Sequence, residues 1–363
     1  MSKSEIGGLY EFPDYDCRRY SESSFSWLKA RSQGLRVRFL SDGRTAISAV
    51  LRNIPDVRKK AIHLPAYLCR AIVQPFLEQG LRIRFYGHDP PLRPLIDTHI
   101  TDGVIFIIDY FGTEAVKERD LKEMLSRGNS VILDVTHSIL DPKRFRMADP
   151  DLYYIASLRK IFPIPDGGIV YHARERFGGR YGRCGNYGPM VEAMAAKRLY
   201  RDSSIPPGDC AMAVKESFLS RYRDFELEKD RNRVRIRPLP AISQEILKHT
   251  DVSKMIERRW ENLSHVCRNF PSRDLLLFDF REIRSPFILP LVFPDSSQRD
   301  RTRDHLVSQG IFPPVHWDIG GIVPESFTLE HHLSQTLLSV PIDQRYDLHD
   351  INRIIEALSA VDT

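Results

Sequence analysis

Short apolar runs alternate with helix-like segments over the first half of this 363-residue chain, and this alternation limits the folds that it can adopt. Runs typical of strands occupy 61–65, 81–86, 103–112, 131–138, 152–157 and 167–172. Helical patterns occupy 45–54, 69–80 and 113–128. Strands joined by crossover helices predict an α/β fold, with a mostly parallel sheet covered on both faces.

The rest of the chain predicts a division into three regions. These are an N-terminal arm with a short helix, a large α/β domain and a small C-terminal α+β domain, over residues 1–33, 34–238 and 239–363. The charged, aromatic stretch 175–230 predicts helices and a long excursion, and one long helix is expected over 240–270. Later strand-like and helical runs support the small domain, at 287–295, 303–310 and 349–361.

Composition excludes several classes of protein. No apolar run approaches the roughly 20 residues of a membrane span, and the N-terminus lacks the apolar core of a signal peptide, so we expect a cytoplasmic protein without a membrane partner. The cysteines are odd in number and show no CxxC spacing, which predicts free thiols and no metal site. They are Cys17, Cys69, Cys184, Cys210 and Cys267.

Four arginines alternate with other residues in "RNRVRIRP", at 231, 233, 235 and 237. In an extended strand all four guanidinium groups would share one face. This face is either a solvated edge, the more common case, or a phosphate-binding surface that reaches a neighbouring subunit. The net charge of only +5 and the absence of a recognised binding motif argue against a nucleic-acid partner.

Candidate chemical groups follow the predicted strands, where open α/β sheets bind ligands. The segment "SDGRTA" precedes a helix, and Gly43 allows a tight turn there. The first turn of that helix is either an anion site or an ordinary N-cap. The strand "VIL" ends at Asp134, with His137 just beyond. A carboxylate at the edge of an apolar layer needs either an arginine or a protonated heterocycle, whereas a lone histidine is more often structural.

Lys160 lies three residues after Ser157, in the segment "SLRKIFPIPDGG". Two prolines stiffen this segment and Gly167-Gly168 allow a sharp turn. A surface lysine is the simplest interpretation of the segment alone. Together, however, an anion-binding helix start, a carboxylate and a lysine match the phosphate, ring nitrogen and aldehyde of pyridoxal 5'-phosphate (PLP).

The motifs "SDGRTA", "LPAYLC", "DVTHS", "SLRK" and "DGG", in this order, resemble those of fold-type I PLP enzymes, closest to the DegT/StrS-type sugar aminotransferases. The resemblance runs from about Val37 to Arg259, and more loosely to the end. Two departures indicate a divergent branch. The family's Gly-Glu-Gly-Gly is "PDGG" here, and the spacing from Ser157 to Lys160 is shorter than is usual.

This resemblance implies an aspartate-aminotransferase-like fold and a role for each matching residue. Lys160 would form the Schiff base, Asp134 would keep the pyridine nitrogen protonated, and His137 would lie near the ring hydroxyl. Tyr67 would stack on the ring. The phosphate would be held by Arg44, Thr45, Ala46 and Ser157.

The resemblance also implies the reaction and the partners. The expected reaction moves an amino group from glutamate to a nucleotide-linked keto sugar, in a homodimer whose active site is shared between subunits. The small-molecule acceptor would meet His316 and Trp317, although Trp317 also fits a wedge between the domains. Arg345 is either a carboxylate-binding residue or, more simply, a structural arginine. Other PLP reactions, such as elimination or transfer to an amino-acid acceptor, stay open, as does a catalytically silent binding protein.

Overall fold

The computed structural model describes residues 5–13, 23–30, 34–97, 99–173, 181–201 and 208–361. Its centre is a seven-stranded sheet in the order β2-β10-β9-β8-β7-β3-β4. Strand β10 is antiparallel to both of its neighbours and the remaining pairs are parallel, so the predicted mostly parallel sheet is confirmed. The strands are β2 (Arg36–Leu40), β3 (Ile62–Pro65), β4 (Ile83–Tyr86), β7 (Val104–Ile108), β8 (Ser130–Asp134), β9 (Leu152–Ser157) and β10 (Gly168–His172).

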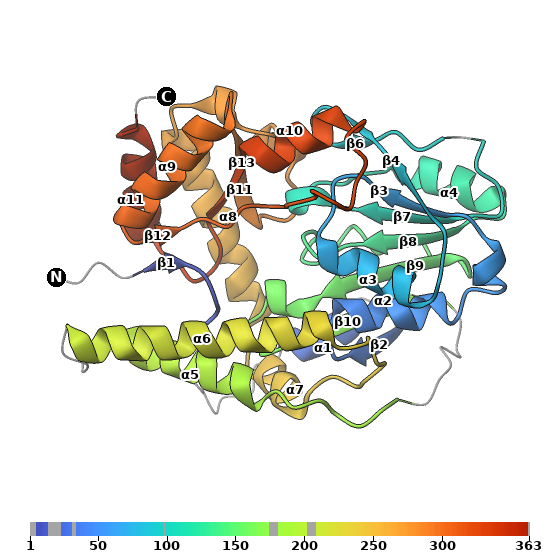
Figure 1. The fold of residues 1–363 in the computed structure, drawn as a ribbon, viewed down its shortest axis with the longest axis horizontal. Coiled ribbons are helices and arrows are strands. Elements are labelled where there is room, and N and C mark those ends of the chain that lie inside the picture. Colours follow the sequence, from blue (N-terminus) through green and yellow to red (C-terminus); the bar gives the residue numbers. More distant parts are fainter. Residues whose placement is uncertain are drawn as a thin grey trace.

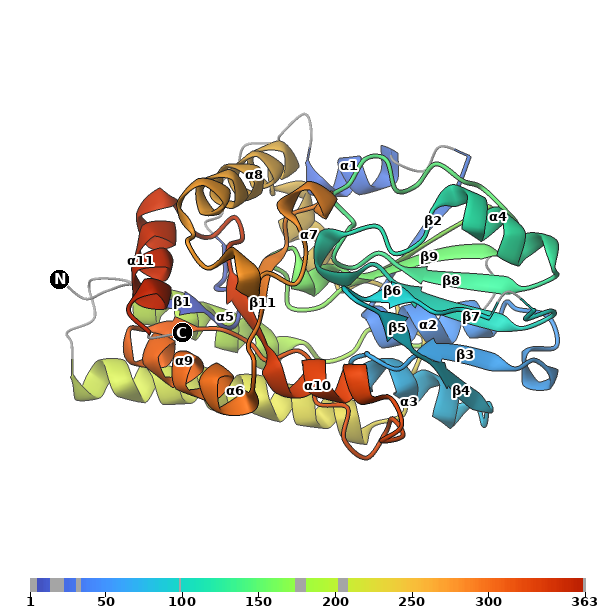
Figure 2. The ribbon, with the colours of Figure 1, turned by 90° about the horizontal axis from the view of Figure 1, so that it is seen from above.

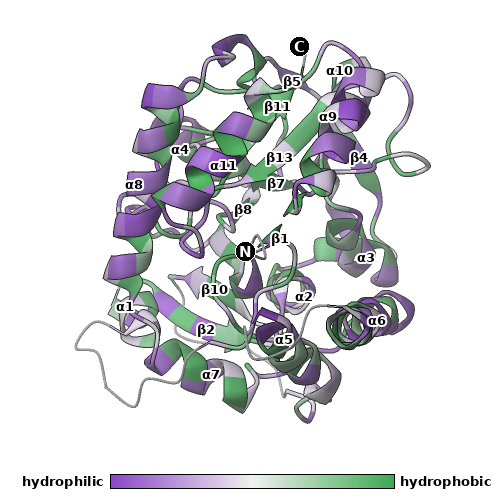
Figure 3. Ribbon diagram, turned by 90° about the vertical axis from the view of Figure 1, so that its left-hand side faces the viewer, coloured by the Kyte–Doolittle hydropathy of each residue, from purple (hydrophilic) through white to green (hydrophobic). Residues whose placement is uncertain are grey.

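Helices cover both faces of this sheet (Figures 1 and 2). Helices α2 (Gly43–Leu51) and α3 (Arg70–Glu78) lie on one face and α4 (Glu118–Ser126) on the other. Strands β7, β8 and β9 are almost entirely buried, which explains why they appear as continuous apolar runs. Figure 3 shows the resulting contrast between hydrophobic strands and hydrophilic outer helix faces.

The C-terminal region, residues 252–361, packs beside one end of the sheet and is referred to below as the small domain. Its antiparallel pair is β11 (Ile288–Val292) with β13 (Leu337–Pro341). The helices of this region are α8 (Val252–Asn269), α9 (Ser296–Ser308), α10 (Thr328–Thr336) and α11 (Leu348–Ser359). A second buried core gathers Leu263, Leu291 and Ile354 there, whereas Met255, earlier on α8, belongs to the core of the sheet. Helix α8 therefore links the two cores.

The long helix expected over 240–270 is wrong, because two helices occupy this stretch. Helix α7 (Ala241–Lys248) ends before a short break, and α8 begins after Asp251. The Asp251 side chain accepts a hydrogen bond from the Lys254 amide and caps α8 (3.1 Å). The Thr250 carbonyl in the break accepts a hydrogen bond from the Ser24 amide on α1 (Ser24–Ala30) (2.8 Å). A distant contact thus holds the break.

The arginine-rich strand expected over 231–237 is also absent. Arg231 is the last residue of α6 (Asp209–Arg231), and the following residues are extended but join no strand ladder. Only an isolated bridge forms here, between Leu40 and Pro238. The sequence also did not predict β2, the edge strand "RVRFL", because its half-exposed residues give no continuous apolar run.

The N-terminal segment 5–13 crosses from the small domain toward the sheet. Strand β1 (Ile6–Gly7) pairs with β12 (Ile311–Phe312). Farther along, Leu9 and Tyr10 pack against a small cluster formed by α6 and α5 (Gly188–Arg201). The remaining short pair is β5 (His88–Asp89) with β6 (Arg93–Pro94).

The four described cysteines are free, as predicted, and Cys17 lies outside the described residues. Within the described part of the chain, no group of histidine, cysteine and acidic side chains is placed to hold a metal ion. No helix among the described residues combines the length and apolar character needed to cross a membrane.

Candidate active site

A cavity of about 480 Å³ opens at the carboxyl ends of the central strands. Strands β8 and β9 and the start of α2 form its base, the loop between β12 and α10 covers it, and α6 forms one side. The sequence-predicted residues that line it are Arg44, Asp134, His137, Ser157, Lys160, His316 and Trp317. Further lining residues that the sequence did not indicate include Cys69, Arg70, Thr136, Tyr222 and Glu226.

Asp134 is the last residue of β8, and its carboxyl group forms no ion pair with any of the described residues. The Thr136 amide (2.9 Å) and hydroxyl (2.5 Å) both donate to Oδ1. No hydrogen bond to Oδ2 is found among the described residues. Burial raises the pKa of Asp134 to about 6, and the negative charge of Asp109 adds to this rise. The carboxyl group therefore has one oxygen available to a cationic partner in the cavity.

The start of α2 lies against Ser157, at the end of β9. A Cβ on Gly43 would come within 3.2 Å of the Ser157 Cβ, so glycine permits this approach. A Cβ on Gly168 would lie only 2.1 Å from the Asp42 carbonyl, which explains the second residue of the glycine pair. Asp42 caps the helix by accepting a hydrogen bond from the Thr45 amide (2.8 Å). The N-cap interpretation of "SDGRTA" is therefore correct, although the cap also faces the cavity.

The predicted phosphate residues differ in their accessibility. Arg44 forms an ion pair with Asp230 through Nη2, while its Nη1 is buried and has no hydrogen-bond partner in the described part of the chain. Thr45 and Ala46 are buried and do not line the cavity. The Thr45 amide and hydroxyl are already bonded within the protein, to Asp42 and Ser41.

Lys160 ends a single 3-10 turn (Leu158–Lys160) that directly follows β9. Its side chain is exposed at the cavity, and its ammonium group has no hydrogen-bond or ion-pair partner among the described residues. The adjacent Arg159 also lines the cavity, but its guanidinium pairs with Glu226 (2.8 Å) and Asp166 (3.6 Å). The structure thus brings the predicted lysine and Asp134 to one cavity.

His137 is a buried, neutral imidazole. Its Nδ1 accepts a hydrogen bond from the Phe111 amide (3.0 Å), and its ring stacks on Phe287 with centroids 4.1 Å apart. Burial lowers the pKa of His137 well below its usual value. Because Nδ1 is an acceptor, the proton lies on Nε2, which is available as a donor.

The small domain contributes His316 and Trp317. The Trp317 ring lies nearly parallel to His137 and Phe111, with centroids 6.0 Å away in each case. The His316 Nδ1 is hydrogen-bonded to the Ser339 hydroxyl (2.8 Å), and burial lowers the pKa of His316 to about 3. Trp317 therefore both lines the cavity and packs between the domains.

Tyr67 and Arg345 do not line this cavity. Tyr67 is fully buried, its hydroxyl donates to the His316 carbonyl, and its ring packs on Trp317. Cys69, two residues farther on, lines the cavity instead. Arg345 forms a bidentate ion pair with Asp343 (2.8 Å for both contacts), as a structural arginine would. The position of Tyr67 does not support ring stacking, and Arg345 fits the structural interpretation that the sequence favoured.

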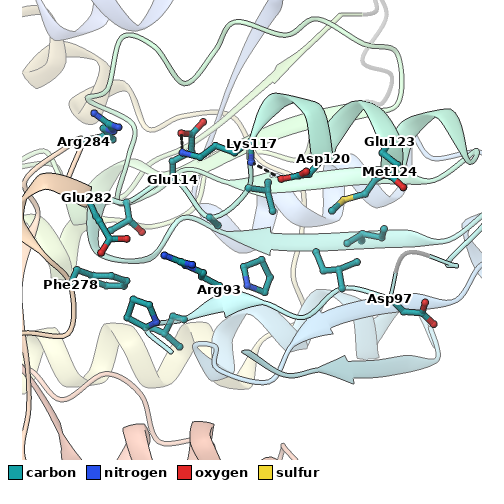
Figure 4. Close-up of a pocket in the computed structure, with 18 of the residues that line it drawn as sticks. Arg93, Asp97, Glu114, Lys117, Asp120, Glu123, Met124, Phe278, Glu282 and Arg284 are labelled. Carbon is teal, nitrogen blue, oxygen red and sulfur yellow. Dashed lines mark hydrogen bonds and ion pairs between the residues drawn. The ribbon is translucent and has the colours of Figure 1, made fainter. Parts of the chain in front are cut away.

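A larger cavity, about 860 Å³, lies elsewhere, beside α4 and the turn between β5 and β6 (Figure 4). None of the predicted site residues lines it. Its charged groups largely neutralise one another, as in the Lys117–Glu114 pair (2.8 Å) and the Arg127–Glu123 pair (3.0 Å). Size alone therefore does not identify the chemical site in this molecule.

Solved structures share the fold along nearly the whole chain. A DegT DnrJ EryC1 StrS aminotransferase from Brucella abortus has a TM-score of 0.60 and 14% identity, with 96% of this chain and 92% of that chain covered. S. venezuelae DesV, in complex with a ketimine intermediate, has a TM-score of 0.63 and 14% identity over 93% and 88%. E. coli GDP-4-keto-6-deoxy-D-mannose-3-dehydratase with bound hydrated PLP has a TM-score of 0.62 and 14% identity, with 98% of this chain and 100% of that chain covered.

No protein-family model and no curated protein matches the chain by sequence. The structural likeness nevertheless confirms the fold class predicted above, the fold-type I architecture of PLP-dependent aminotransferases. The low identity is consistent with a divergent branch.

Proposed function

We propose that this protein is a PLP-dependent aminotransferase that moves an amino group from glutamate to a nucleotide-linked keto sugar. One observation carries the proposal. An exposed lysine and a buried acid, neither of which forms an ion pair with the described residues, and the start of a helix surround one cavity, at the carboxyl edge of an aminotransferase-like sheet. The relatedness of the fold to sugar aminotransferases supports the sugar acceptor.

The residues present fit PLP. Oδ2 of Asp134 is the acceptor that a protonated ring nitrogen needs, and Lys160 supplies a primary amine for the aldehyde. The phosphate would be held by Ser157, the buried Nη1 of Arg44 and the amides of Gly43 and Arg44 at the start of α2. Thr45 and Ala46 are closed off by their burial, so of the predicted phosphate residues we retain Arg44 and Ser157.

In this mechanism, bound PLP supplies an electron sink that stabilises negative charge at the substrate carbon. Lys160 acts as the base and acid, removing the proton at the substrate α-carbon and returning one in the second half-reaction. Asp134 remains ionised and holds the proton at the ring nitrogen. His137 would be able to donate from Nε2 to a ring oxygen of the cofactor, since its Nδ1 is occupied by the Phe111 amide.

Borohydride reduction followed by peptide mass mapping tests this proposal. The expected result is a pyridoxyl mass on Lys160, together with a change in the absorbance spectrum when glutamate is added. Label on another lysine, or none on fully loaded protein, would contradict it. Lys160→Arg is a suitable control, because it keeps the positive charge but cannot be labelled.

Elimination is the main alternative, because a sugar dehydratase shares the fold. The products separate the two reactions. Transamination releases 2-oxoglutarate from glutamate in equal amount to the aminated sugar, whereas dehydration leaves the sugar without a new amino group.

We further propose a cytoplasmic homodimer in which the partner completes the cavity. Support comes from α6, which lines the cavity with Tyr222 and Glu226 and exposes Met212 (52%), Leu219 (41%) and Leu227 (41%). Light scattering of the active protein tests the dimer, and an active monomer would contradict it.

We also propose that Trp317 contacts the acceptor. Trp317→Phe should then slow the acceptor half-reaction several-fold and spare the donor half-reaction. Stopped-flow measurement of each half-reaction, beside a thermal melt, tests this. An equal loss in both halves with a lower melting temperature would instead identify Trp317 as a wedge between the domains.

A further inference from the structure

The backbone immediately after Lys160 is held by two distant parts of the chain. The carbonyl of Ile161 accepts hydrogen bonds from the Tyr10 hydroxyl (3.1 Å) and from Gln344 Nε2 (2.9 Å). The amide of Ile161 is also bonded, to the Leu158 carbonyl (3.0 Å). Both polar backbone groups of Ile161 are therefore restrained, on opposite sides of the peptide chain.

Gln344 is itself oriented by a buried cation. Arg259, only 1% exposed, donates from Nε to Gln344 Oε1 (2.6 Å) and from Nη1 to the Pro286 carbonyl (2.8 Å). Because an arginine can only donate, it fixes Oε1 as the acceptor and directs the Nε2 amide toward Ile161. The Nη2 of Arg259 is buried without a partner. Arg259 therefore orients Gln344 while one of its own donors stays unsatisfied in the interior, and this lowers the stability of the fold.

Tyr10 is held just as firmly. The Arg345 guanidinium lies 4.2 Å from the centre of its ring and donates to the Gly8 carbonyl (3.0 Å). On the same segment, Lys197 donates to the Gly7 carbonyl (3.0 Å). These contacts pin the N-terminal segment 5–13 where Tyr10 reaches Ile161.

We infer that Tyr10 and Gln344 are positioning residues that aim Lys160 into the cavity, an inference that rests on the proposed function. The Lys160 ammonium has no hydrogen-bond or ion-pair partner among the described residues, so the backbone that carries Lys160 has a large part in deciding where this side chain points. Small errors in the position of a reacting group are costly to rate. The N-terminal segment and the small domain therefore both act on the reacting lysine without touching substrate.

Two substitutions test this inference with little change of shape. Tyr10→Phe removes only the hydroxyl. Gln344→Glu keeps the acceptor for Arg259 but removes the amide donor to Ile161. The matched control is Tyr200→Phe, because the Tyr200 hydroxyl bonds Glu5 at the other end of the same segment (3.0 Å).

The first measurement is hydrogen–deuterium exchange of the peptide that spans 157–166, in cofactor-free protein. Tyr10→Phe and Gln344→Glu should speed exchange of its protected amides about fivefold, the factor expected when one hydrogen bond is lost. Tyr200→Phe should leave exchange unchanged. Wild-type exchange in both test variants would overturn the inference.

The second measurement is steady-state kinetics beside a thermal melt. We expect kcat to fall about tenfold in both test variants, with KM for glutamate within twofold of wild type, since only the alignment of the lysine is lost. Unchanged kcat, or losses in kcat and KM that follow the melting temperature, would overturn the positioning role. The borohydride experiment on wild type separates the proposed function from the positioning role. An unlabelled Lys160 would contradict the proposed function, while hydrogen–deuterium exchange would still report whether Tyr10 and Gln344 restrain the backbone at Ile161.

Discussion

Asp109 follows β7 and Asp134 ends β8, so two carboxyl groups stand at neighbouring strand ends of one sheet. The Asp109 amide even donates to the Asp134 carbonyl (3.0 Å). Arg144 binds both oxygens of Asp109 (2.7 and 2.9 Å), and the Ser138 hydroxyl (2.6 Å) and Ala115 amide (3.1 Å) complete its partners. The carboxyl group of Asp134, by contrast, receives hydrogen bonds from Thr136 alone among the described residues.

The difference shows how the fold separates a structural acid from a reactive one. Asp109 is fully buried and neutralised, so its charge is already satisfied within the protein. Asp134 lines the cavity, and burial raises its pKa to about 6. A cationic ligand would therefore be attracted to Asp134, whereas the charge of Asp109 is already neutralised by Arg144.

The largest expected effect comes from Asp134→Asn. The amide carries no charge to stabilise a protonated ring, and losing a charge pair at ~4 Å with an effective dielectric near 20 should slow turnover about 10³-fold. The fold should persist by circular dichroism. Asp109→Asn is the control. It should lower stability but leave turnover per folded molecule near wild type, and the reverse pattern would invalidate the comparison.

Arg144→Ala should mainly affect stability. It leaves the buried Asp109 carboxylate without its cation, which should lower the free energy of unfolding by about 3–5 kcal/mol. Denaturant unfolding measures this loss. A change below about 1 kcal/mol, the range of surface pairs, would show that Asp109 is not the structural member of the two.

Asp134 should also give a distinct pH dependence in the cofactor-free protein. Its folded pKa, about 6, lies above its ordinary value, so its contribution to stability is present at low pH and is lost as pH rises through 6. Asp134→Asn removes this loss. The variant should gain at most about 3 kcal/mol relative to wild type between pH 4 and pH 7, measured by urea unfolding. A constant difference across this range would refute the raised pKa.

The smallest expected effects come from removing the hydroxyl groups that donate to these acids, that of Thr136 to Asp134 and that of Ser138 to Asp109. Thr136→Val removes one donor from Asp134 and should weaken PLP affinity by about three- to tenfold, because the ionised form loses a hydrogen bond. Ser138→Ala removes one donor from Asp109 and should lower unfolding free energy by about 1 kcal/mol without changing PLP affinity. Fluorescence titration and denaturant unfolding compare them. If both variants weakened PLP affinity equally, the assignment of Asp134 as the reactive acid and Asp109 as the structural one would be contradicted.

Much of the fold and part of the site could be predicted from local patterns. The buried central strands produce continuous apolar runs, and the positions of Asp134, Ser157 and Lys160 follow from where these runs end. The break before α8 was not predicted, because the Thr250 carbonyl in it accepts its hydrogen bond from Ser24, which is far away in the sequence. Strand β2 escaped because an edge strand needs no apolar run.

By itself, the sequence determined which residues stand at strand ends and helix starts, because strand periodicity, caps and glycine turns are properties of neighbours along the chain. Only the tertiary structure decided which of these side chains face the cavity. It buried Tyr67 under the small domain and turned Cys69 inward. It also joined Ile161 to Gln344, 183 residues away. The physical reason is that burial and hydrogen-bond partners depend on which surfaces meet, and that is set by packing between elements remote from one another in sequence.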